Sequence, residues 1–219
     1  MASPEIVIVD YHKGNLLSVA RSLSGIGGGV EISDDPGTIA SAAGIICPGV
    51  GSFEDATTYM RTSGEADAIV RAIQSGIPFL GICLGMQILF ERGHEHSGSR
   101  TWGDGWIPGL GVLKGSVTKL ENKRLKVPHV GWDQVHFTEQ GRMCPLFVDV
   151  AEGANVYFTH SYALADDVDS QVVCSYTHYT RSFPSSVWSD NVFGVQFHPE
   201  KSSATGLTVM SNFLHIVRG

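Results

Sequence analysis

The stretch Pro78-Phe-Leu-Gly-Ile-Cys-Leu-Gly-Met-Gln87 decides how this chain is expected to fold. Its first five residues are mostly apolar and predict a buried strand, while residues 86–90 favour a helix after it. Cys83 stands between Gly81 and Gly85, the spacing of a nucleophile elbow, in which a sharp turn lifts one side chain above the end of a parallel sheet. Glycine suits both places because the backbone is strained there and the helix packs close to the strand.

The start of a helix is also a suitable place for a reactive thiol. Helix-start N–H groups and the positive end of the helix dipole favour thiolate over thiol, so the pKa of Cys83 should fall below its usual value of about 8.5. An ordinary junction between strand and helix, with a packed cysteine, explains the same residues. The motif alone does not separate the two hypotheses.

The strand–helix pattern continues on the N-terminal side of the elbow. Apolar runs at 6–9, near 32 and at 44–47 predict strands, and residues 16–23 and 65–74 have helical spacing. Four such units predict a mostly parallel sheet with helices on both faces. The glycine run at 25–29 follows a helix instead of opening one, so it indicates a helix stop and not a phosphate loop.

A second glycine-rich turn follows the strand at 44–47. In Pro48-Gly49-Val50-Gly51, the two glycines allow backbone N–H groups to face a cavity, as an oxyanion hole requires. Taken alone, the loop is as well explained by a plain turn. Cys47, just before it, is expected to pack in the core. Sites in parallel sheets lie at the carboxyl ends of the strands, where both this loop and Cys83 are placed.

A third polar motif follows the last predicted strand, at 192–197. His198-Pro199-Glu200 places an acid two residues beyond a histidine, where it can hold the imidazole in one tautomer and stabilise its protonated form. A surface salt bridge would give the same pattern. A helix predicted at 204–217 closes the chain.

The region between these motifs changes character. Residues 91–108 are polar and glycine-rich, and His94-Glu95-His96 within them fits a solvated loop better than a metal site. Further strands are expected in a partly antiparallel extension, at 111–120, 126–130, 155–159, 171–177 and 183–189. No linker or repeat is visible, so we expect a single domain over residues 1–219.

Composition narrows the class of protein. The chain has 219 residues, 42% of them hydrophobic, with 15 basic against 22 acidic residues and a net charge of −7. This balance speaks against general binding to nucleic acid or membrane surfaces. Four scattered cysteines without a C-x-x-C pair argue against a zinc site or disulfide framework, and favour a reducing compartment. With no recognisable signal peptide or long apolar span, we expect a cytoplasmic protein.

Together the motifs resemble the class I, or triad, glutamine amidotransferases over nearly the whole chain. Among these, the chain is most similar to the glutaminase subunits of imidazole glycerol phosphate synthase. The motifs that carry the resemblance are Gly14-Asn15, Pro48-Gly-Val-Gly51, Gly81-Ile-Cys-Leu-Gly-Met-Gln87, Pro128-His-Val-Gly-Trp132, His160-Ser-Tyr162 and His198-Pro-Glu-Lys-Ser202. The implied fold is flavodoxin-like.

The resemblance implies a role for each matching residue. It makes Cys83 the nucleophile, His198 the acid–base and Glu200 its orienting acid. The implied oxyanion hole comprises Leu84 and the loop of Gly49, Val50 and Gly51. The implied glutamine contacts are Gln87, Glu95, Ser161 and Tyr162. The implied partner-facing residues are Asn15, Trp132, Tyr157 and Lys201.

The family's reaction releases ammonia from glutamine through a cysteine thioester, without a metal or cofactor. The implied partner is a (β/α)8-barrel cyclase subunit, in a heterodimer, which receives the ammonia and makes imidazole glycerol phosphate and an aminoimidazole carboxamide ribonucleotide. Other triad amidotransferase subunits, feeding anthranilate, guanylate or pyridoxal-phosphate synthesis, are the nearest alternative. A cysteine hydrolase on a related sheet and a catalytically silent binding module are more distant ones.

Three features depart from the family pattern. His12-Lys13 stand where relatives commonly have Gly-Met, and Cys47 replaces an aliphatic residue. The run at 25–29 is richer in glycine than expected. None of these touches the triad, but the first falls in the partner-facing region. His160 is expected either to orient the substrate loop or merely to satisfy a backbone carbonyl.

Overall fold

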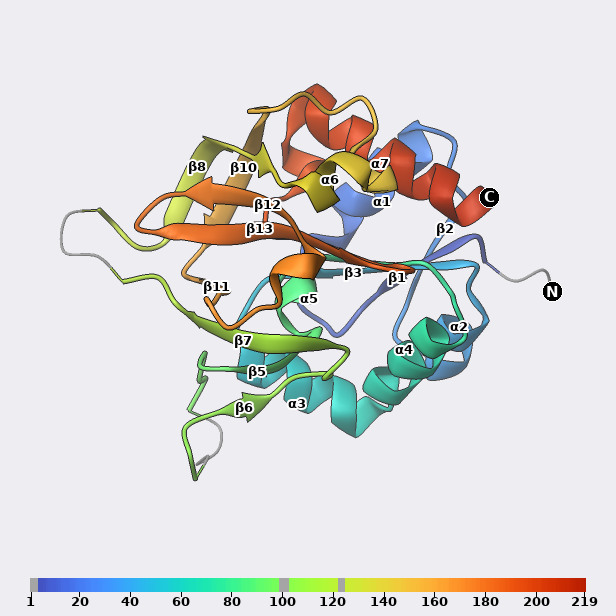
Figure 1. The fold of residues 1–219 in the computed structure, drawn as a ribbon. Coiled ribbons are helices and arrows are strands. Elements are labelled where there is room, and N and C mark those ends of the chain that lie inside the picture. Colours follow the sequence, from blue (N-terminus) through green and yellow to red (C-terminus); the bar gives the residue numbers. More distant parts are fainter. Residues whose placement is uncertain (1–3, 99–102, 122–124) are drawn as a thin grey trace.

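The computed structural model describes residues 4–98, 103–121 and 125–219. Its centre is an eight-stranded sheet in the order β2-β1-β3-β4-β14-β13-β12-β9 (Figure 1). Along the sheet, these strands are β2 (Val30–Ser33), β1 (Ile6–Val9), β3 (Gly44–Gly49), β4 (Phe79–Cys83), β14 (Val192–Val195), β13 (Ser182–Ser189), β12 (Val173–His178) and β9 (His136–Phe137).

The first five of these strands are parallel and the last three are antiparallel. β14 marks the change, because it pairs in parallel with β4 and antiparallel with β13. The predicted α/β architecture, with a mostly parallel sheet and an antiparallel extension, is confirmed. Part of the extension continues the central sheet itself.

Helices cover both faces of the sheet, as expected (Figure 1). One face carries α1 (Leu16–Gly25) and α7 (Ser203–Arg218), and the other carries α2 (Pro36–Ser41), α3 (Phe53–Ser63) and α4 (Glu65–Gln74). A strand covered on both sides buries every residue, and successive side chains enter opposite cores. In β1, Val7 and Val9 pack in one core, while Ile6 and Ile8 pack in the other. This is why the strands read as unbroken apolar runs.

Two smaller sheets flank the central one. A four-stranded sheet has the order β11-β7-β5-β6, and β10 pairs with β8 in a two-stranded sheet. Their strands are β5 (Phe90–Gly93), β6 (Ile107–Pro108), β7 (Leu113–Lys119), β8 (His129–Gln134), β10 (Asn155–His160) and β11 (Tyr162–Leu164). The remaining short elements are α5 (Leu84–Gln87), α6 (Glu139–Met143), η1 (Pro145–Phe147), η2 (Ser170–Val172) and η3 (Pro199–Lys201).

The segment after the elbow differs from its prediction. The sequence predicts a helix over 86–90, but α5 starts at Leu84 and ends at Gln87, and the chain is already extended at Phe90. Strand pairing overrides the local helix preference, because Phe90 pairs with Leu113 of β7. For the same reason the loop expected over 91–108 contains the end of β5 and all of β6. The glycine run at 25–29 does stop α1, as predicted.

The strand expected over 126–130 is displaced along the chain. β8 begins at His129 and continues to Gln134, because its whole length pairs with β10, from His129 opposite His160 to Gln134 opposite Asn155. Alternation in this strand is weak: only His129 is buried, so the apolar pattern alone defines its limits poorly.

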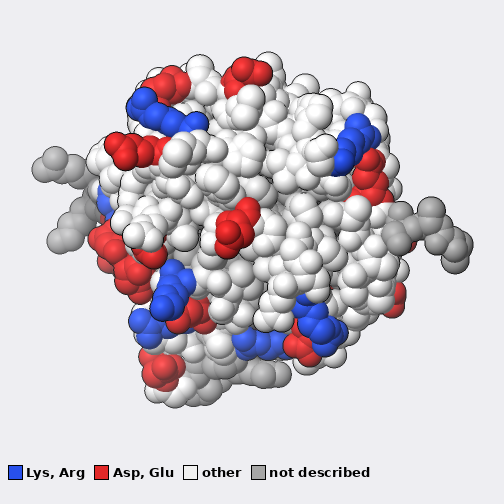
Figure 2. All heavy atoms as spheres, turned by 45° about the vertical axis from the view of Figure 1, so that its right-hand side comes forward, with Lys and Arg blue, Asp and Glu red and all other residues white. Residues whose placement is uncertain are grey.

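Charged side chains are dispersed and of mixed sign. Figure 2 shows a face on which acidic and basic residues lie beside one another and leave broad uncharged areas between them. Within the part of the chain that the structure describes, no helix is both long and apolar enough to cross a membrane.

Glu65, at the start of α4, makes the stability of the fold depend on pH. Its side chain is buried, neither carboxylate oxygen has a hydrogen bond, and burial raises its pKa to about 7. The unfolded value is about 4.3. Since the folded pKa is the higher one, ionisation of Glu65 opposes folding: the penalty is absent at low pH, grows between about pH 4 and pH 7, and is complete above.

We therefore expect Glu65→Gln to stabilise the protein at pH 8 and to change its stability little near pH 4.5. The gain in the free energy of unfolding at pH 8 should be about 1–3 kcal/mol, measured by urea denaturation at both pH values. Glu31→Gln is the control, because Glu31 is exposed on β2. An equal gain at both pH values would contradict the assigned role of the buried charge.

Candidate active site

Cys83 ends β4 in a strained conformation. Its φ is 55° and its ψ is −110°, so the backbone turns sharply before α5. Gly81 and Gly85 are both needed for this approach. A Cβ at Gly81 would lie 2.5 Å from the carbonyl oxygen of Gly85, and one at Gly85 would collide with the carbonyl oxygen of Cys47. The structure thus has the predicted elbow, although α5 is a single turn and supplies only a small dipole.

His198 lies beyond the end of β14, the strand that pairs with β4. Its ring Nδ1 donates a hydrogen bond to Oε1 of Glu200 at 2.9 Å, and both side chains are almost completely buried. The backbone is held as well, because the His198 N–H donates to the Tyr157 carbonyl at 2.9 Å and the Ser202 hydroxyl donates to the His198 carbonyl at 2.6 Å. The ring therefore has one tautomer and one orientation.

The second ring nitrogen of His198 is available to Cys83. Nε2 is buried and forms no hydrogen bond within the protein. Burial by itself would lower the pKa of His198, but the negative charge of the Cys83 sulfur and contact with it, followed by Glu200, outweigh burial and raise the pKa to about 10. Sulfur, imidazole and carboxylate thus interact in series. At neutral pH this arrangement favours imidazolium beside thiolate.

Gln196 is a site residue that sequence reasoning missed. It is fully buried, and its Nε2 donates to the Cys83 sulfur at 3.4 Å. The Nε2 of Gln87 in turn donates to its Oε1 at 2.8 Å. A signal was present: Gln196 is a single amide in an otherwise apolar run just before His198. An N–H donor on sulfur favours the thiolate.

A cavity of about 160 Å³ opens beside the Cys83 sulfur. Gly49, expected at the oxyanion hole, does not line it; it ends β3 opposite Cys83, wedged between the Tyr11 hydroxyl and Leu84. The other oxyanion and glutamine-contact residues of the prediction all do. The lining residues are Val50, Gly51, Cys83, Leu84, Gln87, Glu95, Thr159, His160, Ser161 and Tyr162.

Comparison with known proteins agrees with this geometry. The family model "Glutamine amidotransferase class-I" matches residues 7–217. The chain belongs to the class I glutamine amidotransferases.

Curated relatives place it more narrowly within that family. It is 42% identical over 213 residues to the imidazole glycerol phosphate synthase subunit HisH of Gloeobacter violaceus, covering 97% of this chain and 89% of the relative. It is 44% identical to the HisH subunit of Moorella thermoacetica, covering 97% of this chain and 95% of the relative.

Solved structures share the fold at low sequence identity. One, described as a glutamine amidotransferase, has a TM-score of 0.72 at 16% identity and covers 98% of this chain and 100% of its own. Another, from Thermoplasma acidophilum and described as a GMP synthase component, has a TM-score of 0.71 at 18% identity, covering 100% and 96%. These likenesses concern the fold alone.

Two of the residues matching the amidotransferase substrate contacts lie at opposite ends of the cavity's polar wall. Oε2 of Glu95 accepts the Phe53 N–H at 3.2 Å, yet burial raises the pKa of Glu95 to about 7. The Gln87 amide donates to the Tyr162 carbonyl at 2.8 Å. Gln87 therefore supports the cavity wall through its amide nitrogen, and Glu95 supplies the carboxylate.

His160 holds the same carbonyl from the other side. Its Nδ1 donates to the Tyr162 carbonyl at 2.7 Å, and its Nε2 lies 3.2 Å from Nδ1 of His129. Burial lowers the pKa of His160 to about 3, so the ring is neutral. The two expectations for His160 coincide, because the carbonyl that it satisfies belongs to the cavity wall.

Three of the four residues expected to face a partner form one surface cluster beside His198. Trp132 and Tyr157 are directly opposite in β8 and β10, with ring centroids 6.1 Å apart, and the Lys201 ammonium lies 5.8 Å from the centre of the Tyr157 ring. Trp132 is 54% exposed, which excludes a role as a core aromatic. Asn15 is also exposed, at the N-terminus of α1.

The remaining candidate groups lie outside this arrangement. Cys47 is fully buried, and burial raises the pKa of its thiol, so it packs in the core as expected. His94 contacts the ring of Trp106, and His96 bonds the Gly105 carbonyl at 2.8 Å. Outside the undescribed residues, no three His, Cys, Asp or Glu side chains group as metal ligands.

Proposed function

We propose that this chain is the glutaminase subunit of an imidazole glycerol phosphate synthase in histidine biosynthesis. The observation that carries the proposal is the connected series of Cys83, His198 and Glu200 at one edge of the sheet, beside a cavity. That the curated relatives at 42–44% identity are HisH subunits of this synthase supports the choice of pathway.

In the proposed reaction, the Cys83 thiolate attacks the side-chain carbonyl carbon of glutamine. Backbone N–H groups of Leu84 and of the Gly49–Gly51 loop hold the resulting oxyanion, and each donor stabilises the transition state by up to about 3–4 kcal/mol. The His198 imidazolium protonates the leaving nitrogen, so ammonia departs and a γ-glutamyl thioester forms. His198 then takes a proton from water, which attacks the thioester and releases glutamate.

Binding of glutamine follows from the polar wall of the cavity. Glu95 presents its carboxylate to the α-ammonium group, which would also favour the charged form of a carboxyl whose pKa burial has raised. Gln87 and the backbone around Ser161 and Tyr162 complete the pocket for the amino-acid end. The amide end then reaches the Cys83 sulfur.

Ammonia needs a direct route to its acceptor, because in bulk water at neutral pH it is mostly ammonium and not nucleophilic. We propose that a (β/α)8-barrel cyclase subunit docks on the cluster of Trp132, Tyr157 and Lys201 and receives the ammonia, in a cytoplasmic heterodimer. Exposed aromatic side chains beside a cation are frequent anchors of interfaces. Another triad amidotransferase subunit would share the catalytic residues but need a different partner.

Partner docking tests the proposal. We expect slow glutamine hydrolysis by the isolated chain and much faster hydrolysis when the cyclase subunit and its nucleotide substrate are added, measured as glutamate released. Trp132→Ala should raise the partner concentration needed for half-maximal stimulation by about thirtyfold, the effect of losing an interface hot spot. Met143→Ala is the matched control, since Met143 is 68% exposed on α6 and lies outside the cluster. Fast hydrolysis indifferent to the cyclase subunit would refute the proposal.

A further inference from the structure

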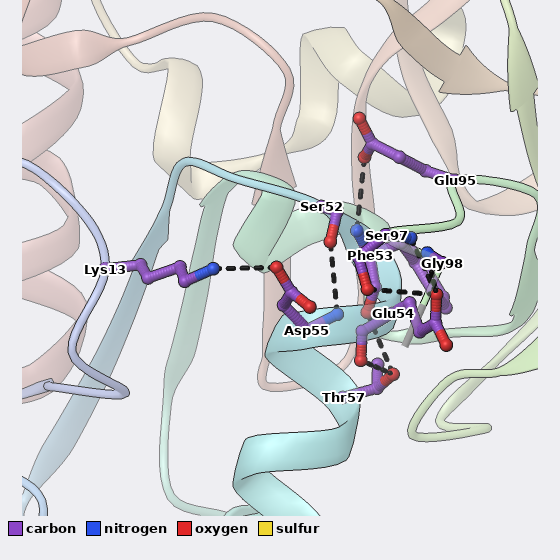
Figure 3. A network of polar contacts seen from close by, with 9 residues as sticks. All are labelled: Lys13, Ser52, Phe53, Glu54, Asp55, Thr57, Glu95, Ser97 and Gly98. Atoms are coloured by element: carbon purple, nitrogen blue, oxygen red, sulfur yellow. Dashed lines mark hydrogen bonds and ion pairs between the residues drawn. The ribbon is translucent and has the colours of Figure 1, made fainter. Parts of the chain in front are cut away.

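The first turn of α3 is bonded to the loop that carries Glu95 (Figure 3). Two consecutive N–H groups of this turn reach the same residue: that of Phe53 donates to the Glu95 carboxylate at 3.2 Å, and that of Glu54 donates to the Glu95 carbonyl at 3.1 Å. The turn itself is ordered by Ser52, whose hydroxyl accepts the Asp55 N–H at 3.2 Å. Backbone and side chain of Glu95 are thus held by one helix end.

The Glu54 carboxylate fastens the next residues of that loop. One of its oxygens accepts the Ser97 N–H at 2.6 Å, the Ser97 hydroxyl at 3.0 Å and the Gly98 N–H at 3.1 Å. Glu54 is fully buried, so these contacts are shielded from water. Hydrogen bonds to an ionised acceptor are about twice as strong as neutral ones and strongly directional.

This attachment matters because the loop itself has little packing to hold it. His94, His96, Ser97 and Gly98 are exposed, and Glu95 is only partly buried. Figure 3 shows the Glu95 side chain extending from the loop to the start of α3, with Glu54 below it directed at Ser97 and Gly98. The position of the Glu95 carboxylate in the cavity therefore depends on bonds made two and three residues further along the chain.

We propose that Glu54 is a positioning residue for substrate recognition: it sets the location of the Glu95 carboxylate and thereby the affinity for the α-ammonium group of glutamine. This rests on the proposed function, in which Glu95 binds that group. The helix that Glu54 begins also follows directly on Gly51 of the proposed oxyanion loop. One helix turn thus fixes the spacing between the groups that bind the two ends of glutamine.

Glu54→Gln tests this role, because glutamine keeps the shape but presents an uncharged amide to the three donors. In the complex with the cyclase subunit, we expect KM for glutamine to rise at least about tenfold while kcat stays within about twofold, the signature of lost ground-state and transition-state binding alike. Glu152→Gln is the matched control. Glu152 also accepts a backbone N–H, from Phe137 at 3.0 Å, but far along the sheet at β9.

A substrate analogue separates positioning from general damage. Glutaramate lacks the α-amino group of glutamine, so its hydrolysis does not depend on where the Glu95 carboxylate lies. The preference of the wild type for glutamine over glutaramate in kcat/KM should shrink at least about tenfold in Glu54→Gln, as it does in Glu95→Gln. The double variant should be no worse than Glu95→Gln, because both changes remove the same interaction.

Each outcome bears on the inference. An unchanged KM and an unchanged preference for glutamine would overturn it, as would equal losses with both substrates in a variant whose melting temperature is unaltered. If Glu54→Gln fails to fold, Ser97→Ala removes one of the three contacts and should shift the preference in the same direction by a smaller factor; no shift there would overturn the inference as well. A wild type that releases no glutamate with its partner would instead refute the proposed function.

Discussion

Cys83→Ala should abolish glutamine-dependent synthesis in the complex while synthesis from added ammonium salts continues. Loss of the nucleophile removes the only sulfur next to both His198 and the cavity, so we expect a fall in glutamine-dependent turnover of at least about 10⁴-fold. Ammonia supplied from solution does not need the thioester. The measurement is the rate of imidazole glycerol phosphate formation with each nitrogen donor.

Cys47→Ala is the matched control for this experiment. Its thiol lies one strand away in β3, is fully buried, and has a pKa that burial raises, so it is not a nucleophile. The variant should keep glutamine-dependent synthesis even where it melts at a lower temperature. Loss of both glutamine-dependent and ammonium-dependent synthesis in Cys83→Ala would show that the residue serves assembly, not catalysis.

Glu200→Gln should give the second-largest effect, a fall in glutamine-dependent kcat of about 10²–10⁴-fold. The variant retains the size of the side chain beside His198 Nδ1 but loses the charge that stabilises imidazolium. The pKa of His198 should therefore fall, so the imidazolium form and with it the activity should disappear at a lower pH than in the wild type. A full pH profile of kcat/KM measures both effects.

Glu139→Gln provides the comparison for Glu200→Gln, because Glu139 is exposed on α6 and touches no group of the site. Its profile should match the wild type. If Glu200→Gln lowers kcat by less than about threefold and leaves the pH profile in place, the carboxylate does not orient or stabilise His198. Ammonium-dependent synthesis should be normal in both variants.

The order of elements and the meeting of the site residues could be predicted for a simple reason. β4 and β14 are buried on both faces, so their apolar runs are visible in the sequence, and parallel strands end at the same edge of a sheet. A residue that directly follows such a strand must lie at that edge. Cys83 and His198 are two such residues, and the glycines around Cys83 added the turn.

The parts that were missed depend on contacts between distant segments. β5 replaced the end of an expected helix because β7 offered Phe90 a partner, and β8 extends to Gln134 because β10 does. Gln196 looks like any polar residue until the turn of β4 places a sulfur in front of it. The bonds of Glu54 to Ser97 and Gly98 join positions more than forty residues apart, and no local pattern indicates them.

By itself, the amino-acid sequence determined which residues are buried in pairs of faces, where the strands end, and which side chains stand at those ends, since these follow from hydrophobic periodicity and from the backbone freedom of glycine. Only the tertiary structure decided which of those side chains touch the sulfur, which carbonyls and amides hold the cavity wall, and how the Glu95 loop is fastened. Hydrogen bonds act over about 3 Å and depend on direction, so they can be assigned only once the segments that make them have been brought together.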